Sequence, residues 1–461
     1  TTLFRSIILN EAKASNLVES LSKVNWKLEK LEKKPTVRRP VPPFITSTLQ
    51  QEANRKLRLS ARETMRCAQG LYERGFITYM RTDSVHLSEQ AIKAARECVQ
   101  LKYGENYLSD KPRQFSSKAI NAQEAHEAIR PAGENFRIPK ETELSGRDLS
   151  LYELIWKRTV ASQMAEAKLT MINAEISAGK AIFKSSGKSI DFPGFFRAYV
   201  EGSDDPGAAL EQQEVVLPNL VPGSNLDLIT NDAISHETKP PARYTEAALV
   251  KILEKEGIGR PSTYASIIGT IVDRGYAQIS NNSLAPTFTA FAVTALLEEH
   301  FPDLVDTTFT AKMESSLDEI SSGNLEWLPY LETFYKGKNG LEIKVQKTEG
   351  DIDGKAYRQV DFDDLPCVVR IGSNGPWLEG TRLDASGNEI QAKGNLPMDI
   401  IPGDLDEKKV NQILSGPSDL GEDPKTGEKV FLRFGPYGPY VQLGNNEDNN
   451  EKPRRASLPK E

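Results

Sequence analysis

Cysteine and histidine are scarce in this chain, which narrows the kinds of site that it can contain. Three of its 461 residues are cysteine and four are histidine. Cys67, Cys98 and Cys367 lie far apart and form no Cys-x-x-Cys pair, so neither a zinc knuckle nor a disulfide framework is expected. The sequence therefore indicates a reducing compartment and a site built from other residue types.

Long apolar runs and an excess of positive charge are missing as well. A membrane span needs about 18 apolar residues, but the most apolar stretch, from Phe288, stops at Glu298. No signal peptide and no methionine open the chain, so its first residues are expected to be a cut end or a cloning scar. The net charge of −7 argues against a protein coated with nucleic acid, yet it allows a local basic groove. We expect a cytoplasmic protein without a membrane partner.

The order of sequence patterns predicts a multi-domain α+β protein, because 461 residues correspond to about two to four domains. Residues 10–34 begin with a helical pattern and become extended, and the proline-rich stretch 29–44 is expected to be an exposed connector. Helical patterns begin at Ser60, residues from about Leu169 to Leu228 alternate apolar and polar side chains, and helices return from Thr245 to about Gly337. A region rich in Gly, Pro and Asp follows at 351–445, and the polar tail 446–461 is expected to be disordered.

One pattern occurs twice in the C-terminal region. Arg370 and Arg433, 63 residues apart (433 − 370), each begin the sequence R-x-G-x-x-G-P followed by an aromatic residue. The two aromatic residues are Trp377 and Tyr440. Rings presented beside turns suit stacking on nucleic-acid bases, and the alternative is that each ring packs under its own hairpin.

The stretch GFITYMRTDS, residues 75–84, contains the first candidate site. Its β-branched and aromatic residues predict a short strand through Ile77 to Arg81, which would place Tyr79, Arg81 and Asp83 on one face. A tyrosine phenol with a pKa of about 10 is a poor nucleophile unless it is helped. The planar guanidinium of Arg81 suits a phosphate under attack, and Asp83 would orient it. The alternative is an ordinary exposed strand face.

The stretch QEAHEAIRP contains the second candidate site. A helix is expected here that ends at Pro131, with His126 and Arg130 four residues apart on the same face. His126 could donate to a phosphate or relay a proton. The spacing differs from H-E-x-x-H, so a zinc protease is not indicated. The alternative is a structural histidine.

The stretch EGIGRPSTYASII contains the third candidate site. Pro261 suits the first turn of a helix, which would place Ser262 and Thr263 where backbone N–H groups point outward. Together with Arg260, such a helix start is suited to a phosphate, and Arg274 lies at the other end of the helix. The alternative is simple capping. There is no Walker A loop, so ATP is not expected, and no acidic stretch in the chain looks like a metal site.

Five motifs in this order resemble the central part of bacterial type IA DNA topoisomerases. They are PPFITSTLQQEA, LYERGFITYMRTDS, QEAHEAIRP, KPPARYTEAALVKILEKEGIGRPSTYASII and FTAKMESSLDEI. The resemblance extends from about Asn10 to Tyr335, and the repeats after Asp351 are similar to the zinc-free C-terminal repeats of several bacterial groups.

The resemblance implies a four-domain toroid, of which this chain would be a fragment. Residues 1–38 would be the N-terminal piece of a β-rich arch with its connector, and 39–166 a winged-helix-like domain that carries Tyr79. Residues 167–244 would complete the arch, 245–337 would form a helical DNA-gripping domain, and 351–445 would form the C-terminal repeats.

The same resemblance implies that Tyr79 attacks one DNA strand and keeps its 5′ phosphate as a phosphotyrosine, until the free 3′ hydroxyl reverses the step without ATP. Arg81 would stabilise the phosphate charge, Asp83 would hold Arg81, and His126 would shape the site. The residues implied to bind DNA are Arg260, Ser262, Thr263, Arg274 and Arg130, with Gln69 and Glu73 as further candidates beside Tyr79.

The carboxylates that bind Mg²⁺ in this family lie in an N-terminal Toprim domain, which would precede the first residue here. We therefore expect a fragment that is inactive alone, from a monomeric, nucleoid-associated enzyme that relaxes negatively supercoiled DNA with Mg²⁺. The alternative is a non-catalytic module for single-stranded DNA, in which Tyr79 only stacks. A tyrosine recombinase is disfavoured, because no group of Arg and His surrounds a C-terminal tyrosine.

Overall fold

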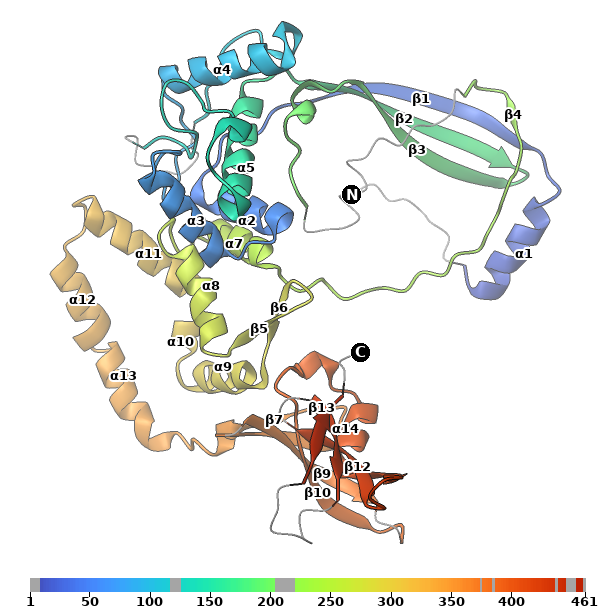
Figure 1. Cartoon of the computed structure of the whole chain (residues 1–461), viewed down its shortest axis with the longest axis vertical. Helices are drawn as coiled ribbons and strands as arrows, with labels where there is room; N and C mark the ends of the chain where they lie inside the picture. Colours follow the sequence, from blue (N-terminus) through green and yellow to red (C-terminus); the bar gives the residue numbers. More distant parts are fainter. Residues whose placement is uncertain are drawn as a thin grey trace. The chain divides into compact units, whose positions relative to one another are not determined.

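The chain forms two compact units, Thr1–Ala242 and Arg243–Glu461, in a computed structural model (Figure 1). The structure describes residues 9–116, 126–203, 220–373, 375–383, 386–435, 438–444 and 453–458. Both units combine helices with antiparallel sheets, which confirms the predicted multi-domain α+β class. Within these described ranges, no helix is long and apolar enough to cross a membrane. The finer division into six segments stays a prediction.

A helical body forms the core of the first unit. Its helices are α2 (Thr46–Leu57), α3 (Ala61–Glu73), α4 (Glu89–Tyr103) and α5 (Gly146–Ser162), with 3-10 turns at Glu105–Tyr107, Pro139–Glu141 and Gly194–Arg197. The start of α3 is fixed by a capping box, in which Ser60 Oγ accepts from the Glu63 N–H and the Glu63 carboxylate accepts from the Ser60 N–H. Leu71, Tyr152 and Trp156 are fully buried between the helices. This packed body holds the segment that contains Tyr79.

A long antiparallel sheet extends from the helical body (Figure 1). Its strands, in the order β3-β2-β1-β4, are β1 (Trp26–Arg38), β2 (Ala167–Ala178), β3 (Ala181–Phe192) and β4 (Asn225–Leu226), and α1 (Glu11–Leu21) precedes β1. The expected connector at 29–44 is therefore wrong up to Arg38, because those residues form most of β1. The strand tolerates Pro35 because β4 pairs only with Trp26 and Lys27, which leaves one side of β1 unpaired at the proline.

The second unit begins with helices and one small hairpin. The helices are α7 (Glu246–Glu256), α8 (Tyr264–Asp273), α9 (Phe288–His300), α10 (Pro302–Val305), α11 (Thr307–Ser321), α12 (Trp327–Lys336) and α13 (Leu341–Thr348). Between α8 and α9, β5 (Ala277–Ser280) pairs with β6 (Ser283–Pro286). Asn281 and Asn282 make the turn with φ of 49° and 63°, the backbone that a two-residue hairpin requires.

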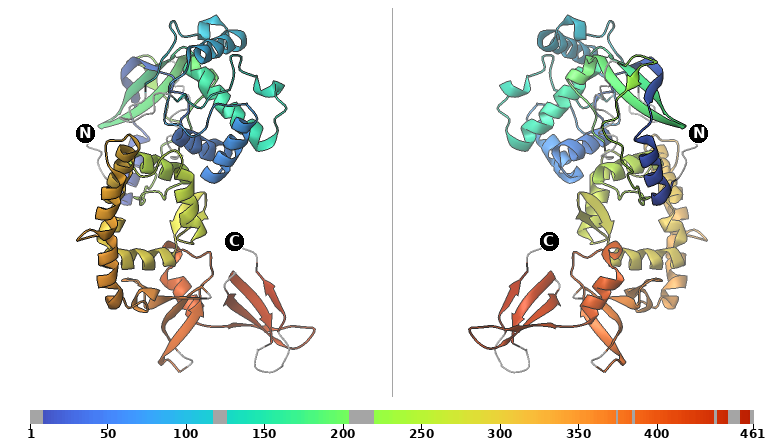
Figure 2. Two further views of the ribbon diagram at one scale, coloured as in Figure 1. Left: turned by 90° about the vertical axis from the view of Figure 1, so that its left-hand side faces the viewer. Right: turned by 90° about the vertical axis from the view of Figure 1, so that its right-hand side faces the viewer.

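Two four-stranded antiparallel sheets follow, and Figure 2 shows them as distinct sheets. The first contains β7 (Gln359–Asp361), β8 (Cys367–Gly372), β9 (Gly375–Leu383) and β10 (Glu389–Asn395), and the second contains β11 (Ser418–Glu422), β12 (Lys429–Gly435), β13 (Gly438–Leu443) and β14 (Arg455–Ser457). Helix α14 (Glu407–Leu414) lies between them in sequence, and 3-10 turns occur at Glu349–Asp351, Ala356–Arg358 and Pro402–Asp404.

The sequence repeat forms the same hairpin in both sheets. Arg370 is paired with Trp377 across β8 and β9, and Arg433 is paired with Tyr440 across β12 and β13. The disordered tail predicted for 446–461 is wrong for Arg455–Ser457, which form β14 against β13. The other described residues of that tail are 453, 454 and 458, and the rest of the prediction lies outside the described residues.

Candidate active site

Tyr79 lies on an extended segment, and the strand predicted through Ile77 to Arg81 is absent. Ile77 makes an isolated bridge, and the residues after it form no strand. The predicted alternation of side chains is nevertheless present. Tyr79 is 42% exposed and Arg81 is also exposed, whereas Met80 and Thr82 are buried at 1% and 2%. The phenol and the guanidinium therefore lie on the solvent side of one extended segment.

The segment is held by the start of α2, and this explains why it needs no strand partner. The Thr46 N–H donates to the Thr82 carbonyl at 2.9 Å, and Thr46 Oγ1 donates to the Met80 carbonyl at 2.8 Å. The same hydroxyl oxygen accepts from the Thr82 N–H at 2.9 Å. Thr46 is fully buried, so these bonds are shielded from water and fix the backbone on both sides of Arg81.

Tyr72 lies against Tyr79, and the sequence analysis did not identify it as a site residue. The two ring centroids are 5.3 Å apart with an interplanar angle of 70°, an edge-to-face contact. Tyr72 is 41% exposed on α3. Gln69 and Glu73, predicted as neighbours of Tyr79, share this face of the helix, and Gln69 Nε2 donates to Glu73 Oε1 at 2.7 Å. Their i, i+3, i+4 spacing from Gln69 is the signal that could have identified Tyr72.

The segment that contains His126 runs beside the Tyr79 segment, but it is not a helix. Residues 117–125 lie outside the described residues, and residues 126–132 contain only isolated bridges, from Ile129 to Phe44 and from Pro131 to Ile77. The predicted helix is therefore wrong from His126 onward. The Thr78 N–H donates to the carbonyl of residue 130 at 2.9 Å, so this segment is attached next to Tyr79. His126 is half-buried there.

Arg130 points into the protein. It is 8% exposed, its Nη2 lies 2.6 Å from Glu127 Oε2, and its Nη1 donates to the carbonyls of Pro131 and Gly133 at 2.9 and 3.2 Å. Burial raises the pKa of Glu127, but hydrogen bonds from Ser88 and Arg130 outweigh it and leave this pKa below its usual value. Arg130 therefore has the contacts of a structural residue, and its predicted DNA contact gains no support from them.

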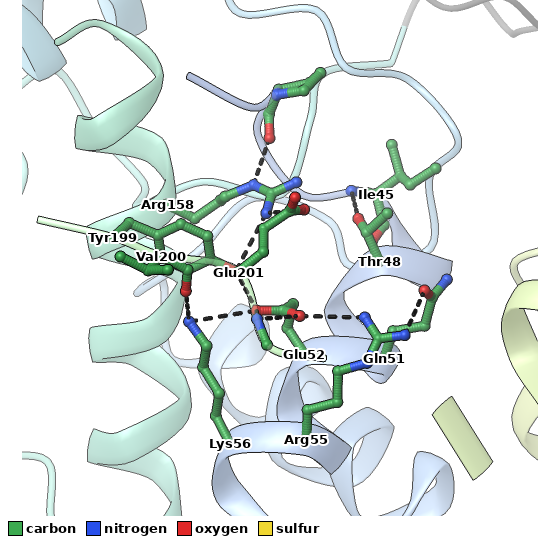
Figure 3. A network of polar contacts seen from close by, with 12 residues as sticks. Ile45, Thr48, Gln51, Glu52, Arg55, Lys56, Arg158, Tyr199, Val200 and Glu201 are labelled. Atoms are coloured by element: carbon green, nitrogen blue, oxygen red, sulfur yellow. Dashed lines mark hydrogen bonds and ion pairs between the residues drawn. The ribbon is translucent and has the colours of Figure 1, made fainter. Parts of the chain in front are cut away.

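A network of buried charges holds the other end of α2 (Figure 3). The Glu52 carboxylate accepts from the Tyr199 hydroxyl at 2.5 Å and from the Gly202 N–H at 3.0 Å, and it pairs with Lys56 at 3.3 Å. Burial raises the pKa of Glu52, but these partners reverse the shift and hold its pKa below the ordinary value. Burial also lowers the pKa of Lys56. The network fixes the helix whose first residue, Thr46, holds the Tyr79 segment.

The third candidate site lies in the second unit, and its arginine is largely engaged. Helix α8 begins at Tyr264, so Pro261 belongs to the preceding turn and not to the first helical turn. Arg260 donates to Asp318 through Nη2 at 2.7 Å and Nε at 3.2 Å, and through Nη1 to the Gly259 carbonyl at 2.7 Å. The hydrogen bond to Asp318 raises the pKa of Arg260. Thr263 Oγ1 accepts from the Arg260 N–H at 2.8 Å.

Two acidic residues of α11 position this loop. Glu314 accepts from the Gly259 N–H at 3.1 Å, and Asp318, one helical turn later, holds the Arg260 side chain. Gly259 has a φ of +81°, a backbone conformation that other residues rarely adopt, so glycine is favoured there. A Cβ atom would lie 2.9 Å from Ile267 Cδ1, the movable end of a flexible side chain. Of the other predicted DNA contacts, Ser262 and Arg274 are exposed.

The rings of the two repeats each lie next to a cation. Lys393 Nζ is 4.8 Å from the centroid of the Trp377 ring, and the Arg455 guanidinium carbon is 5.5 Å from the centroid of the Tyr440 ring. Both aromatic residues are half-buried. The rings are therefore neither fully exposed nor enclosed beneath their hairpins.

Comparison with known proteins identifies the family. A family model described as DNA topoisomerase matches residues 3–332, and one described as topoisomerase C-terminal repeat matches residues 423–461. The chain belongs to the bacterial type IA DNA topoisomerase family. The second match covers β12, β13 and β14, so the sheet that presents Tyr440 is one of the family's C-terminal repeats.

Relatives of this topoisomerase chain come from several bacteria. The chain is 62% identical to DNA topoisomerase 1 of Synechococcus elongatus over 98% of its length, and 47% identical to DNA topoisomerase 1 of Mycobacterium leprae over 94%. It covers 51% and 49% of these two proteins, so it spans about half the length of the curated relatives it matches. The solved full-length topoisomerase I of Thermotoga maritima matches with a TM-score of 0.64 at 32% identity, over 84% of this chain and 62% of that one.

The Mg²⁺ that the family implies does not fit the residues at hand. Across the described ranges, no group of three or more His, Cys, Asp and Glu side chains is arranged to hold a metal ion. Asp83 is half-buried beside the exposed Arg81 and belongs to no such group. The site described above therefore consists of an exposed phenol, an exposed guanidinium and the residues that support them.

Proposed function

We propose that the whole protein is a type IA DNA topoisomerase that relaxes negatively supercoiled DNA, with Tyr79 as the nucleophile. The phenol oxygen forms a bond to a DNA phosphorus, and the bond from phosphorus to the 3′ oxygen breaks. The phenol gives up one proton and the departing 3′ oxygen takes up one, so the products are a phosphotyrosine and a 3′ hydroxyl. The 3′ hydroxyl later reverses the reaction, so the bond energy is kept and ATP is not consumed. The observation that carries the proposal is the exposure of Tyr79 and Arg81 on one side of a backbone fixed by Thr46.

The neighbours of Tyr79 would share the remaining tasks. Arg81 places a permanent positive charge two residues from the nucleophile, where it stabilises the charge that develops on the phosphate. Asp83 would orient Arg81, and His126 would contact the scissile region from the adjacent segment. Gln69 and Glu73 border the site on α3 through their mutual hydrogen bond.

The second unit would bind the single strand. Since Asp318 and backbone carbonyls occupy the Arg260 guanidinium, we assign Arg260 and Thr263 mainly to shaping the loop. Exposed Ser262 and Arg274 are then the side chains of this group best placed for phosphate contacts. Trp377 and Tyr440 would stack on bases.

We further propose that Mg²⁺ is bound by a Toprim domain of the same polypeptide, outside this chain, and that the protein is a monomer associated with the nucleoid in the cytoplasm. The half-length coverage of the curated relatives supports a contribution from further domains. The described residues alone would bind single-stranded DNA and turn over very slowly or not at all.

The test uses the full-length protein with single-stranded DNA labelled at its 3′ end, followed by denaturing gels. The label then lies on the fragment whose 5′ phosphate stays on the protein. We expect a covalent adduct that Tyr79→Phe abolishes and Tyr72→Phe retains. An adduct that persists in Tyr79→Phe would show that the nucleophile is another residue. Salt-sensitive binding without any adduct in the wild-type protein would favour the non-catalytic binding module instead.

A further inference from the structure

The first repeat positions its cation through the residue directly opposite in the sheet. Lys393 on β10 is paired with Glu379 on β9, two residues after Trp377. The Glu379 carboxylate contacts Lys393 Nζ at 3.1 Å and accepts from Arg370 Nε at 2.8 Å. The ammonium is thereby held near the face of the indole ring. The Glu379 carboxylate thus neutralises part of the charge of both Lys393 and Arg370.

The second repeat reproduces this arrangement with a neutral residue in place of the carboxylate. Arg455 on β14 is paired with Gln442 on β13, again two residues after the ring, Tyr440. Gln442 is fully buried, its Oε1 accepts from Arg455 Nε at 3.1 Å, and its Nε2 donates to the Gly444 carbonyl at 3.0 Å. The guanidinium is therefore aimed at the ring by a fixed, neutral amide.

A cleft beside the ring of the first repeat can hold a ligand. It has a volume of about 670 Å³, and both Trp377 and Lys393 line it, together with the glycine-rich turn at Gly372 and Gly375. Small-molecule sites commonly measure about 300–1,000 Å³, so a nucleotide unit fits in size. The cleft therefore brings together an aromatic ring and an ammonium group, the two kinds of group that a base and its phosphate would contact.

We propose that each repeat holds one nucleotide of a single strand, with the base against the ring and the phosphate against Lys393 or Arg455, and that the residue two positions after the ring sets the strength of the phosphate contact. Glu379 weakens the first site, whereas Gln442 leaves the second at full strength. This inference rests on the proposed function only in taking single-stranded DNA as the ligand.

The physical reason is competition for the same cations. A phosphate that approaches Lys393 must displace or share the Glu379 carboxylate and is repelled by it, since both are anions. At Arg455 the equivalent place in the sheet is occupied by the neutral Gln442. Because each phosphate contact releases counterions, the two sites differ in their salt dependence as well as in affinity, with a slope of about 0.7 per contact for single strands.

The decisive experiment measures the affinity of the full-length protein for an oligothymidylate at several salt concentrations. Glu379→Gln makes the first site resemble the second, so we expect affinity to rise about twofold to fivefold at low salt and the salt slope to steepen. Glu389→Gln is the matched control, because it removes the same charge from an exposed position on β10 of the same sheet. Arg455→Gln should lower both affinity and slope.

Two further variants separate the ring from the cation. Lys393→Gln in the Glu379→Gln background should erase the gain, and Trp377→Leu should weaken binding without changing the salt slope. The inference is overturned if Glu379→Gln behaves like Glu389→Gln, if Arg455→Gln leaves the slope unchanged, or if the oligonucleotide does not bind. Adduct formation at saturating DNA is recorded in parallel. A gain in Glu379→Gln without any adduct would refute the proposed function and leave this inference standing.

Discussion

Replacing Tyr199 by phenylalanine tests whether the buried charge network holds the helical body together. The Tyr199 hydroxyl donates to Glu52 at 2.5 Å and accepts from Arg158 Nη1 at 3.1 Å. Tyr199 is 3% exposed, and its ring packs edge-on against Phe44 at 6.2 Å. The substitution deletes one oxygen atom, keeps the ring contacts, and leaves a buried carboxylate with one donor fewer.

The magnitude follows from the two bonds that are lost. A hydrogen bond to a charged group contributes about 1.5–3 kcal/mol, roughly twice a bond between neutral groups. Glu52 retains the Gly202 N–H and Lys56, and Arg158 retains Glu201 and the Pro42 carbonyl. We therefore expect a loss of about 2–3 kcal/mol in the free energy of unfolding of the first unit, and a decrease in its melting temperature of about 4–12 °C.

Hydrogen exchange of peptides from α2 and α5 is the assay, because it reports on the first unit separately from the second. Tyr152→Phe is the matched control. It removes a hydroxyl from another buried tyrosine, but that hydroxyl donates to a neutral acceptor, the Arg137 carbonyl, at 2.8 Å, and should cost about 0.5–1.5 kcal/mol. If Tyr199→Phe costs no more than Tyr152→Phe, the charge network adds nothing beyond ordinary hydrogen bonds and the reasoning is wrong.

Four further predictions concern the Tyr79 segment, its support and the loop that contains Gly259 and Arg260. The folded pKa of Glu52 lies below the ordinary value of 4.5, so the stability that its ionised form contributes is present above pH 4.5 and is lost as the pH falls through the folded pKa. In urea titrations, Glu52→Gln should therefore be less stable than wild type at pH 7, and the difference in the free energy of unfolding should disappear in acid. Thr46→Val removes the hydroxyl that forms hydrogen bonds with the backbone of Met80 and Thr82, on either side of Arg81. The adduct yield of the full-length protein should fall at least about tenfold, while its affinity for single-stranded DNA stays unchanged. A loss of affinity as large as the loss of adduct would contradict this. Tyr72→Leu removes the edge-to-face contact with Tyr79, worth about 0.5–1.5 kcal/mol, and should slow adduct formation about twofold to tenfold, whereas Tyr72→Phe should not. Gly259→Ala introduces backbone strain at φ +81° and should weaken single-strand binding, measured by fluorescence anisotropy, more than Ser262→Ala does.

The face of the Tyr79 segment could be predicted from the sequence, although its strand could not. Alternating exposure follows from any extended backbone, whether or not a neighbouring strand is present, and Tyr79, Met80 and Arg81 show it clearly. The hydrogen-bond partner is Thr46, which lies far earlier in the chain and belongs to a helix. No local pattern near Tyr79 indicates that a helix N-terminus replaces the strand.

The His126 segment shows how tertiary contacts override a helical pattern. Its composition favours a helix, but Pro131 disfavours helical geometry at the residue before it. The backbone instead bonds to Phe44 and Thr78. The error matters for function, because a helix would have presented His126 and Arg130 on the same face, whereas Arg130 in fact points inward to Glu127.

The loop that contains Arg260 shows the same limit for side chains. The glycines and the arginine could be recognised from the sequence, and so could the motif that forms α11. The ion pair between Arg260 and Asp318 could not, because it depends on how α11 packs against the loop. Without that contact, Arg260 would be available for a phosphate, and with it the exposed neighbours become the better candidates.

The C-terminal repeats show what only the register of a sheet reveals. The turn and the ring lie in one short motif, so the sequence identifies them. The cation follows the ring by 16 residues in the first repeat (393 − 377) and by 15 in the second (455 − 440), so no fixed spacing connects them. Both cations nevertheless pair with the residue two positions after the ring. Because different spacings bring a cation to the same position opposite the residue two places after the ring, we infer that this position contributes to binding. The exchange of Glu379 for glutamine tests this inference directly.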